Sequence, residues 1–498
     1  MDQYARVYLN GVFLGEHKGG YEPFSFDVTE AIGAENLLEV RVEDDLESRT
    51  LPYGKQREKR GGMWYTPVTG IWQTVWLESV CEQYVASMEI KTHACGAVIK
   101  FFRADGSLFD GDGSEYAEES NPLAAALIGT FAGAINGDVT VKLPDGGEEV
   151  FKILGGYARI SLDAPRLWSP EDPFLYEMTV RAGEDRFTSY FAIRTLDVRE
   201  IGGIKRLCLN GKPYFFHGVL DQGYFSDGLF LPADPRGYER DILAMKELGF
   251  NTLRKHIKLE PERFYYDCDR LGMVVSQDMV NNGSYSFIRD TALPTIGFKR
   301  KNDSRLNRRK EWREAFVSGM ESTVRMLSGH PCICYWTIFN EGWGQFNSGE
   351  MYEMLKSLDS TRFIDTTSGW FFGGESDVDS QHVYFKPVSL TPSDKPSVLS
   401  EFGGYTLNIE GHVFNIRKSY GYKTFLSSEA LGEALTALYE AEIIPAARSG
   451  LCASIYTQLS DVEDETNGLL TYDRRVTKVT PEVMRAIASK LSEACGER

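Results

Sequence analysis

The sequence predicts two β-sandwiches followed by a (β/α)8 barrel, and three observations lead to that prediction. A chain of 498 residues is too long for one ordinary core, so two or three domains are expected. The chain is 42% hydrophobic and 25% charged, which is typical of a globular protein. Near residue 198 the apolar pattern changes from short alternating stretches to strands separated by helical stretches.

Residues 1–82 consist of short alternating stretches with turn signals between them. The stretch ARVYLNGVFLGEHKGG indicates a hairpin whose turn is Asn10-Gly11, and ENLLEVRVED and GIWQTVWLESV continue the strand pattern. This region is small for a β-sandwich. It also starts directly on what looks like an interior strand, so we expect it to be incomplete at its N-terminal side.

Residues 83–197 predict a second sandwich. About seven strand-like stretches over this length suit an immunoglobulin-like arrangement. They include SMEIKTH, VIKFFRADG, DVTVKLPDG, YARISLD, YEMTVRAG and FTSYFAIRTLDV.

Residues 198–498 have the size and alternation of a (β/α)8 barrel. Eight strands are predicted, in YFFHGVLD, FNTLRKHI, MVVSQDM, CICYWTIFNE, RFIDTTSGW, DSQHVYF, SVLSEFGG and CASIYTQL. Helix starts stand between and after them. Asp234 and Pro235 open one helix and Thr480 and Pro481 open the last, because a capping side chain followed by proline favours a helix N-terminus.

Charge, cysteine spacing and hydropathy narrow the class of protein. A net charge of −18 argues against nucleic-acid binding, which needs clustered Lys and Arg. The one basic run, Lys299–Lys310, predicts a solvated loop, with an interaction patch as the alternative. The eight cysteines are scattered, and neither a signal peptide nor a membrane-spanning run is seen, so we expect a reduced, cytoplasmic protein without membrane contact.

In a (β/α)8 barrel the reactive side chains gather at the carboxyl ends of the strands. Those ends carry Asp221 and Gln222, Arg254 and His256, Gln277 and Asp278, Asn340 and Glu341, Trp370, Tyr384, Glu401, and Tyr456 and Gln458. Glu341 and Glu401 end strands that are otherwise apolar. A buried carboxylate without a partner is costly, so we expect this pair to be functional.

Two carboxylates facing one cavity are what glycoside hydrolysis requires: one protonates the leaving oxygen and the other attacks the anomeric carbon. Arg254 and Tyr384 could keep the attacking carboxylate ionised. Asn340 could bond the sugar hydroxyl beside the reacting carbon. The flat side chains of Trp370, Trp343 and Tyr456 could contact the sugar ring, while Asp278 and His256 could line the pocket or support its loops.

The segments IFNEGWG and SVLSEFGG, in this domain order, resemble the two catalytic strands of glycoside hydrolase family 2. LNGVFLGEHKGGYEPFSFDVT, GIWQTVWLE, LWSPEDPFLY and LNGKPYFFHGV are also similar to family segments. The resemblance implies a jelly-roll sandwich, an immunoglobulin-like sandwich and a catalytic barrel. It also implies a retaining mechanism with Glu341 as acid/base, Glu401 as nucleophile and Tyr384 against that nucleophile.

Several positions depart from the family pattern. Where the family's glucuronidases have an Asn-x-Lys pair that grips the sugar carboxylate, this sequence has Glu465 and Asn467, and a second anion would repel a uronate. Asn282 and Ser284 replace the Glu and His of the metal-dependent galactosidases, so no metal is expected. Trp64 stands where a sandwich loop often supplies an Asp, and His256 is shifted by one position.

The resulting hypothesis is a retaining exo-β-glycosidase acting on a carbohydrate, with β-galactosides favoured and no cofactor. An enzyme of the same family acting on glucosides, mannosides or uronides is the first alternative. A non-catalytic sugar-binding protein on the same scaffold is the second. Association into a homo-oligomer is left open.

Overall fold

The computed structural model describes residues 2–109, 135–295, 298, 302–369, 374–384, 386–390 and 393–496. The chain forms two compact units. One contains Met1–Thr74, Leu196–Leu327 and Cys332–Arg498, and the other contains Val75–Thr195 with the short segment Ser328–Pro331.

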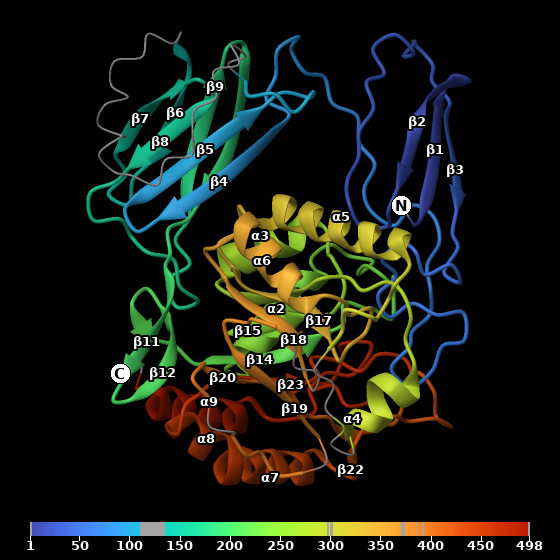
Figure 1. Cartoon of the computed structure of the whole chain (residues 1–498), viewed down its shortest axis with the longest axis vertical. Coiled ribbons are helices and arrows are strands. Elements are labelled where there is room, and N and C mark those ends of the chain that lie inside the picture. The colour runs from blue at the N-terminus through green and yellow to red at the C-terminus, as the bar shows by residue number, and fades with distance from the viewer. Residues whose placement is uncertain are drawn as a thin grey trace. The chain divides into compact units, whose positions relative to one another are not determined.

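The first unit begins with a three-stranded antiparallel sheet, drawn in dark blue in Figure 1. Its strands are β1 (Tyr4–Leu9), β2 (Val12–Lys18) and β3 (Leu38–Glu43), with β1 in the middle. The predicted Asn10-Gly11 turn joins β1 to β2, and both turn residues have positive φ, as a tight hairpin requires. The segment GIWQTVWLESV is not a strand, and Trp76 and Leu77 are exposed. No strand of the described chain pairs with this segment, and alternation alone does not supply hydrogen-bond partners.

The second unit contains one antiparallel sheet of seven strands. They are β4 (Ser87–His93), β5 (Gly96–Phe102), β6 (Ile135–Lys142), β7 (Glu148–Leu154), β8 (Tyr157–Ser161), β9 (Tyr176–Ala182) and β10 (Asp185–Phe191). One buried cluster contains Ile99 of β5 and Val180 of β9, which lie far apart in the sheet order. The sheet therefore folds over a single core, as a sandwich does.

A small sheet of β11 (Leu196–Ile201), β12 (Ile204–Leu209) and β13 (Lys212–Pro213) leads into the barrel. All eight predicted barrel strands are present. They are β14 (Phe216–Asp221), β15 (Thr252–Lys255), β16 (Val274–Asp278), β17 (Ile333–Asn340), β18 (Phe363–Ser368), β19 (Asp379–Val383), β20 (Ser397–Gly403) and β23 (Leu451–Thr457). They form one parallel sheet that runs from β18 through β14 and β23 to β19, so the barrel is nearly closed.

Helices cover the outside of the barrel (Figure 1). The main ones are α2 (Gly237–Glu247), α3 (Glu262–Leu271), α5 (Lys310–Leu327), α6 (Ser348–Leu358), α7 (Ser428–Leu438) and α9 (Pro481–Cys495). Shorter pieces are η2 (Phe287–Ala292), α4 (Leu293–Thr295), η3 (Tyr439–Ile443) and α8 (Ile444–Arg448), and β21 (Tyr405–Leu407) pairs with β22 (Lys423–Phe425). α9 begins at Pro481 after Thr480, as predicted, whereas α2 begins two residues after Pro235.

The basic run Lys299–Lys310 and the polarity of the helices bear on surface and membrane contact. Residues 302–309 of the basic run form a loop in which Arg305, Arg308 and Arg309 are exposed, and the start of the run lies outside the described residues. Within the described chain, every helix is too short or too polar to cross a bilayer.

Candidate active site

Two buried carboxylates meet at the carboxyl end of the barrel strands. Glu341 directly follows β17 and Glu401 lies near the end of β20. One oxygen of each glutamate and one ring nitrogen of His382 all lie within 4.8 Å of one another. The structure therefore brings together the two glutamates that the sequence singled out.

A tight turn aims Glu341 into the barrel mouth. Its backbone is left-handed, with φ +51°, and its N–H donates to the Ser368 carbonyl at 2.8 Å. The amide of Trp343 closes the turn by donating to the Asn340 carbonyl at 2.8 Å. Gly344 also has positive φ, and a Cβ there would lie 2.6 Å from the Asn282 carbonyl oxygen. The left-handed backbone of Glu341 costs about 1–3 kcal/mol because the residue is not a glycine. Strain of this kind is typical of functional sites.

Strong donors surround Glu401. Arg254 donates to its Oε1 at 3.1 Å, and the hydroxyl of Tyr384 donates to its Oε2 at 2.5 Å. Burial by itself would raise the pKa of Glu401. The positive charges of His382 and Arg254 and the Tyr384 hydrogen bond outweigh burial and lower that pKa to about 2. Glu401 is therefore an anion at neutral pH.

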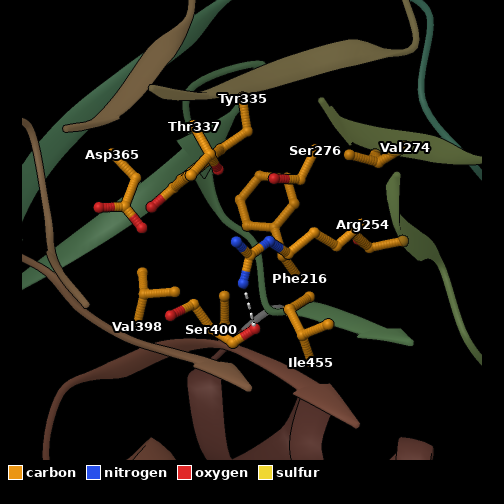
Figure 2. A pocket seen from close by; sticks show the side chains of 12 residues that line it. Phe216, Arg254, Val274, Ser276, Tyr335, Thr337, Asp365, Val398, Ser400 and Ile455 are labelled. Carbon is orange, nitrogen blue, oxygen red and sulfur yellow. Dashed lines mark hydrogen bonds between the residues drawn. The ribbon is translucent and has the colours of Figure 1, made fainter. Parts of the chain in front are cut away.

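Arg254 connects four groups of the site. It donates to both oxygens of Asp278 at 3.0 Å, to Asn340 Oδ1 at 2.9 Å and to the Ser400 carbonyl at 3.0 Å, in addition to Glu401. Figure 2 shows the guanidinium among the side chains that line a small cavity inside the barrel, with the bond to Ser400 dashed. A fork-shaped cation with several acceptors holds its partners at fixed positions.

Asp278 and His256 support Arg254. Nδ1 of His256 lies 2.8 Å from Asp278 Oδ2, and both side chains are buried. Burial opposes ionisation of Asp278, but Arg254 and His256 hold its pKa below the usual range. Burial and the nearby charge of Lys55 lower the pKa of His256 to about 4, which makes it a neutral imidazole at neutral pH. Of the two roles considered from the sequence, these contacts favour support of the neighbouring loops and of Arg254.

Glu341 has the opposite environment to Glu401. Burial raises its pKa, and the negative charge of Glu401 adds to this rise. A hydrogen bond with His382, whose Nδ1 lies 2.9 Å from Oε1, acts in the other direction. Glu341 is therefore the member of the pair that can hold a proton.

His382 is a site residue that the sequence analysis did not single out. Its ring lies between the two glutamates, with Nδ1 3.6 Å from Glu401 Oε2 and Nε2 3.1 Å from Ser368 Oγ. A usable signal was present in the sequence, because His382 stands two residues before Tyr384 and the side chains of a strand alternate.

The predicted aromatic residues are placed differently from one another. Tyr384 contacts Glu401 as expected. Trp343 is 1% exposed and stacks on Trp64, with ring centroids 5.3 Å apart, so Trp64 is the more accessible indole of the two. Trp370 lies outside the described residues.

Tyr456 contacts other parts of the barrel. Its ring packs against Phe402 and its hydroxyl accepts the Tyr405 amide at 3.1 Å. Neighbouring side chains of a strand point to opposite sides. The following residue, Thr457, is the one whose hydroxyl lies 3.0 Å from that of Tyr384.

A loop from the first sheet completes the mouth. This 53–66 loop is held to the barrel by the Tyr53 amide, which donates to the Asn281 carbonyl at 3.1 Å. At its far end the amide of Thr66 donates to Glu463 at 2.9 Å, and Tyr65 donates to Glu465 at 2.5 Å. The loop brings Lys55, Trp64 and Tyr65 to the site.

Glu341, His382 and Glu401 are the only group of the described residues whose spacing could hold a metal ion. The donor set already has other partners: Arg254, a permanent cation, bonds Glu401, and His382 bonds Glu341. The arrangement suits proton transfer and nucleophilic attack without a further cation.

The chain is similar to known proteins in sequence and fold. Residues 200–417 match the TIM barrel domain of glycosyl hydrolases family 2, and residues 102–194 match a second domain of glycosyl hydrolases family 2. A β-galactosidase of Thermoanaerobacter pseudethanolicus is 25% identical over 369 residues, which are 72% of this chain and 44% of that protein. A putative β-glucuronidase of Formosa agariphila is 24% identical over 80% of this chain and 47% of that protein.

The chain thus spans about half the length of the curated relatives it matches. Among solved structures, the β-D-glucuronidase of Dictyoglomus thermophilum superposes with a TM-score of 0.65 at 17% identity, covering 99% of this chain and 85% of that one. This likeness shows a shared fold.

Proposed function

Because the chain belongs to glycoside hydrolase family 2, we propose that it is a retaining exo-β-glycosidase that removes terminal β-linked sugars. The observation that carries the proposal is the pair of glutamates with opposite pKa shifts, close enough to act on one sugar. Oxygens within 4.8 Å support retention, since retaining enzymes have carboxyl groups about 5–5.5 Å apart and inverting ones about 6.5–9.5 Å.

In the first step of the proposed reaction, Glu401 attacks the anomeric carbon while the bond to the leaving oxygen breaks. Glu341 gives its proton to that oxygen, which leaves a sugar ester on Glu401. In the second step Glu341 takes a proton from water, the water oxygen attacks the anomeric carbon, and the ester bond breaks. Both glutamates then regain their starting protonation states.

The surrounding residues hold the pair in these states. Arg254 and Tyr384 favour the ionised form of Glu401, and burial raises the pKa of Glu341, which favours its protonated form. Asn340 is oriented by Arg254 through its amide oxygen, so its amide nitrogen can donate to a sugar hydroxyl. The half-buried Trp64 offers a ring to an apolar sugar face.

The first choice for the sugar is a β-galactoside, in line with the sequence resemblance and the name of the Thermoanaerobacter relative. β-Glucosides, β-mannosides and β-uronides are the alternatives within the family. A non-catalytic sugar-binding role is the alternative outside it.

A panel of 4-nitrophenyl β-glycosides tests the proposal, with Glu401→Gln as the inactive control. We expect hydrolysis of at least one β-glycoside, a first product of β configuration by NMR, and a loss of roughly 10⁴-fold or more in Glu401→Gln. A first product of α configuration would contradict retention. Hydrolysis of no aryl β-glycoside, together with sugar binding unchanged by Glu401→Gln, would favour the binding protein.

A further inference from the structure

Lys55 is a buried cation without an anionic partner. Its side chain belongs to a residue that is 7% exposed, and it forms no hydrogen bond or ion pair with the described part of the chain. Burying an ammonium without a counter-charge is costly, so an arrangement of this kind normally has a compensating partner.

The other buried lysines of the described chain all have carboxylate partners. Lys255 donates to Asp221 at 2.6 Å, Lys258 to Glu260 at 2.8 Å and Lys478 to Asp461 at 2.6 Å. The fold therefore supplies an anion wherever a buried lysine is structural. Lys55 is the exception, and it is the one that lies in the 53–66 loop at the barrel mouth.

Backbone contacts fix the position of Lys55. Its carbonyl accepts the Tyr65 amide at 3.0 Å, and the preceding Gly54 lies so close to the Ile257 carbonyl that a Cβ would be 2.8 Å away. The ammonium lies 5.5 Å from the ring centroid of Trp343, two residues after Glu341. Its charge offsets part of the rise that burial gives the pKa of Glu341, and after burial it is the main cause that lowers the pKa of His256.

A second cation of the same loop also lacks an ion pair among the described residues. The guanidinium of Arg57 lies 3.8 Å from the ring centroid of Trp64, and its Nη2 is buried without a hydrogen bond. In contrast, Arg60 pairs with Glu463 and Asp464. The part of the loop next to the glutamates is therefore positively charged in a chain whose net charge is −18.

We propose that Lys55 binds the carboxylate of a sugar acid, so that the preferred substrate is a β-hexuronide rather than a neutral hexoside. This proposal rests on the function proposed above. A single ammonium next to aromatic rings matches one monoanionic group attached to an apolar sugar face. Lys55 would thus determine specificity and is not part of the bond-breaking step.

Glu465, the anion expected to repel a uronate, is held by hydrogen bonds within the protein. The two oxygens of Glu465 accept from Tyr65 at 2.5 Å and from Asn467 at 3.1 Å, so donors already stabilise this carboxylate. Asn467 is itself occupied, because its Oδ1 accepts from Gln458 at 2.8 Å. This pair cannot grip a carboxylate, and the cation comes instead from the 53–66 loop.

Matched pairs of substrates test the proposal. We compare kcat/KM for 4-nitrophenyl β-galacturonide against β-galactoside, and for β-glucuronide against β-glucoside. In one of these configurations we expect the wild type to prefer the acid, and Lys55→Met to lower the acid-to-neutral ratio by about 100-fold or more. Lys55→Arg should recover part of the ratio. Lys59→Met, which removes an exposed lysine of the same loop, should leave the ratio unchanged.

Two further measurements distinguish a structural role of Lys55 from a role in binding the sugar acid. Thermal unfolding of Lys55→Met should be unchanged or raised, because an unpaired buried charge is removed; a lowered melting temperature would indicate a structural ion pair and overturn the proposal. Calorimetric titration of Glu401→Gln with galacturonate and galactose, and with glucuronate and glucose, measures binding without hydrolysis. Tighter binding of the acid that Lys55→Met abolishes is the expected result.

If no β-glycoside is hydrolysed but the acid still binds through Lys55, the glycosidase proposal fails and the carboxylate site stands. If neutral glycosides are hydrolysed best and Lys55→Met leaves the ratio unchanged, the carboxylate site fails and the glycosidase stands.

Discussion

The two sides of the barrel mouth shift the pKa of a glutamate in opposite directions. On the β20 side, Glu401 accepts from Arg254 and Tyr384, and its pKa falls to about 2. On the β17 side, Glu341 is also buried, but His382 is the one hydrogen-bond partner of its side chain among the described residues, and its pKa is raised. The difference shows that the number and charge of the donors, more than burial, separate a nucleophile from an acid.

The donors on the Glu401 side come from strands that are distant in sequence. Arg254 is on β15 and Tyr384 follows β19, and both reach β20 because the barrel places their ends around one axis. Removing these donors should reduce the difference in pKa between Glu401 and Glu341. The expected effects differ in size.

Arg254→Met should have the largest effect. It leaves the buried Asp278 and Glu401 without their cation, so we expect a loss of about 3–5 kcal/mol in the free energy of unfolding and kcat/KM lowered by roughly 10³-fold or more. Urea unfolding and steady-state kinetics measure both. Arg236→Met, at a side chain 73% exposed, is the control. Near wild-type activity in Arg254→Met would show that Glu401 does not depend on this cation.

Tyr384→Phe should lower kcat by about 10²-fold and move the acidic limb of the pH–rate profile upwards. Glu401 must be ionised to attack, so activity falls as the pH drops through its pKa. The lost hydrogen bond is one of the interactions that lowers that pKa, so the limb shifts to higher pH. Tyr352→Phe, which removes a hydroxyl bonded to Asp377, is the matched control. An unshifted acidic limb would contradict the assignment of Glu401 as nucleophile.

His382→Asn should shift both limbs of the profile upwards with a smaller loss of rate, less than about 10²-fold. The acid Glu341 must be protonated, so activity falls as the pH rises through its pKa. The His382 hydrogen bond lowers that pKa, and its loss moves the basic limb to higher pH. The charge of His382 also lowers the pKa of Glu401, so the acidic limb moves in the same direction. A basic limb that moves downwards would show that Glu341 is not the acid.

Asp365→Asn should affect stability more than activity. Asp365 lines the cavity beneath Arg254, shown in Figure 2, and burial raises its pKa to about 6. The folded protein holds a proton that the unfolded chain has released above pH 4, so this group loses stabilising free energy as the pH rises through 4–6. We expect Asp365→Asn to gain up to about 2–3 kcal/mol relative to wild type between pH 4 and pH 7. Parallel unfolding curves measured over this range test it, and a constant difference would contradict the raised pKa.

The strand pattern made most of the barrel predictable. β16, β17 and β20 begin in apolar runs that lead into polar residues, and Asn340-Glu341 and Glu401 were visible for that reason. The direction of single side chains was less predictable. β20 has irregular pairing with β23 around Leu399 and Phe402, and such irregularities change which residues point inwards, as the positions of Tyr456 and Thr457 show.

By itself, the sequence determined the period of its apolar residues, and with it the strands, the helices and the two glutamates at strand ends. Only the tertiary structure decided that His382 lies between those glutamates and that Lys55 reaches the same mouth from the first sheet. The physical reason is that local patterns report which face of an element is buried, whereas the partner of a charge depends on contacts between segments far apart in the chain.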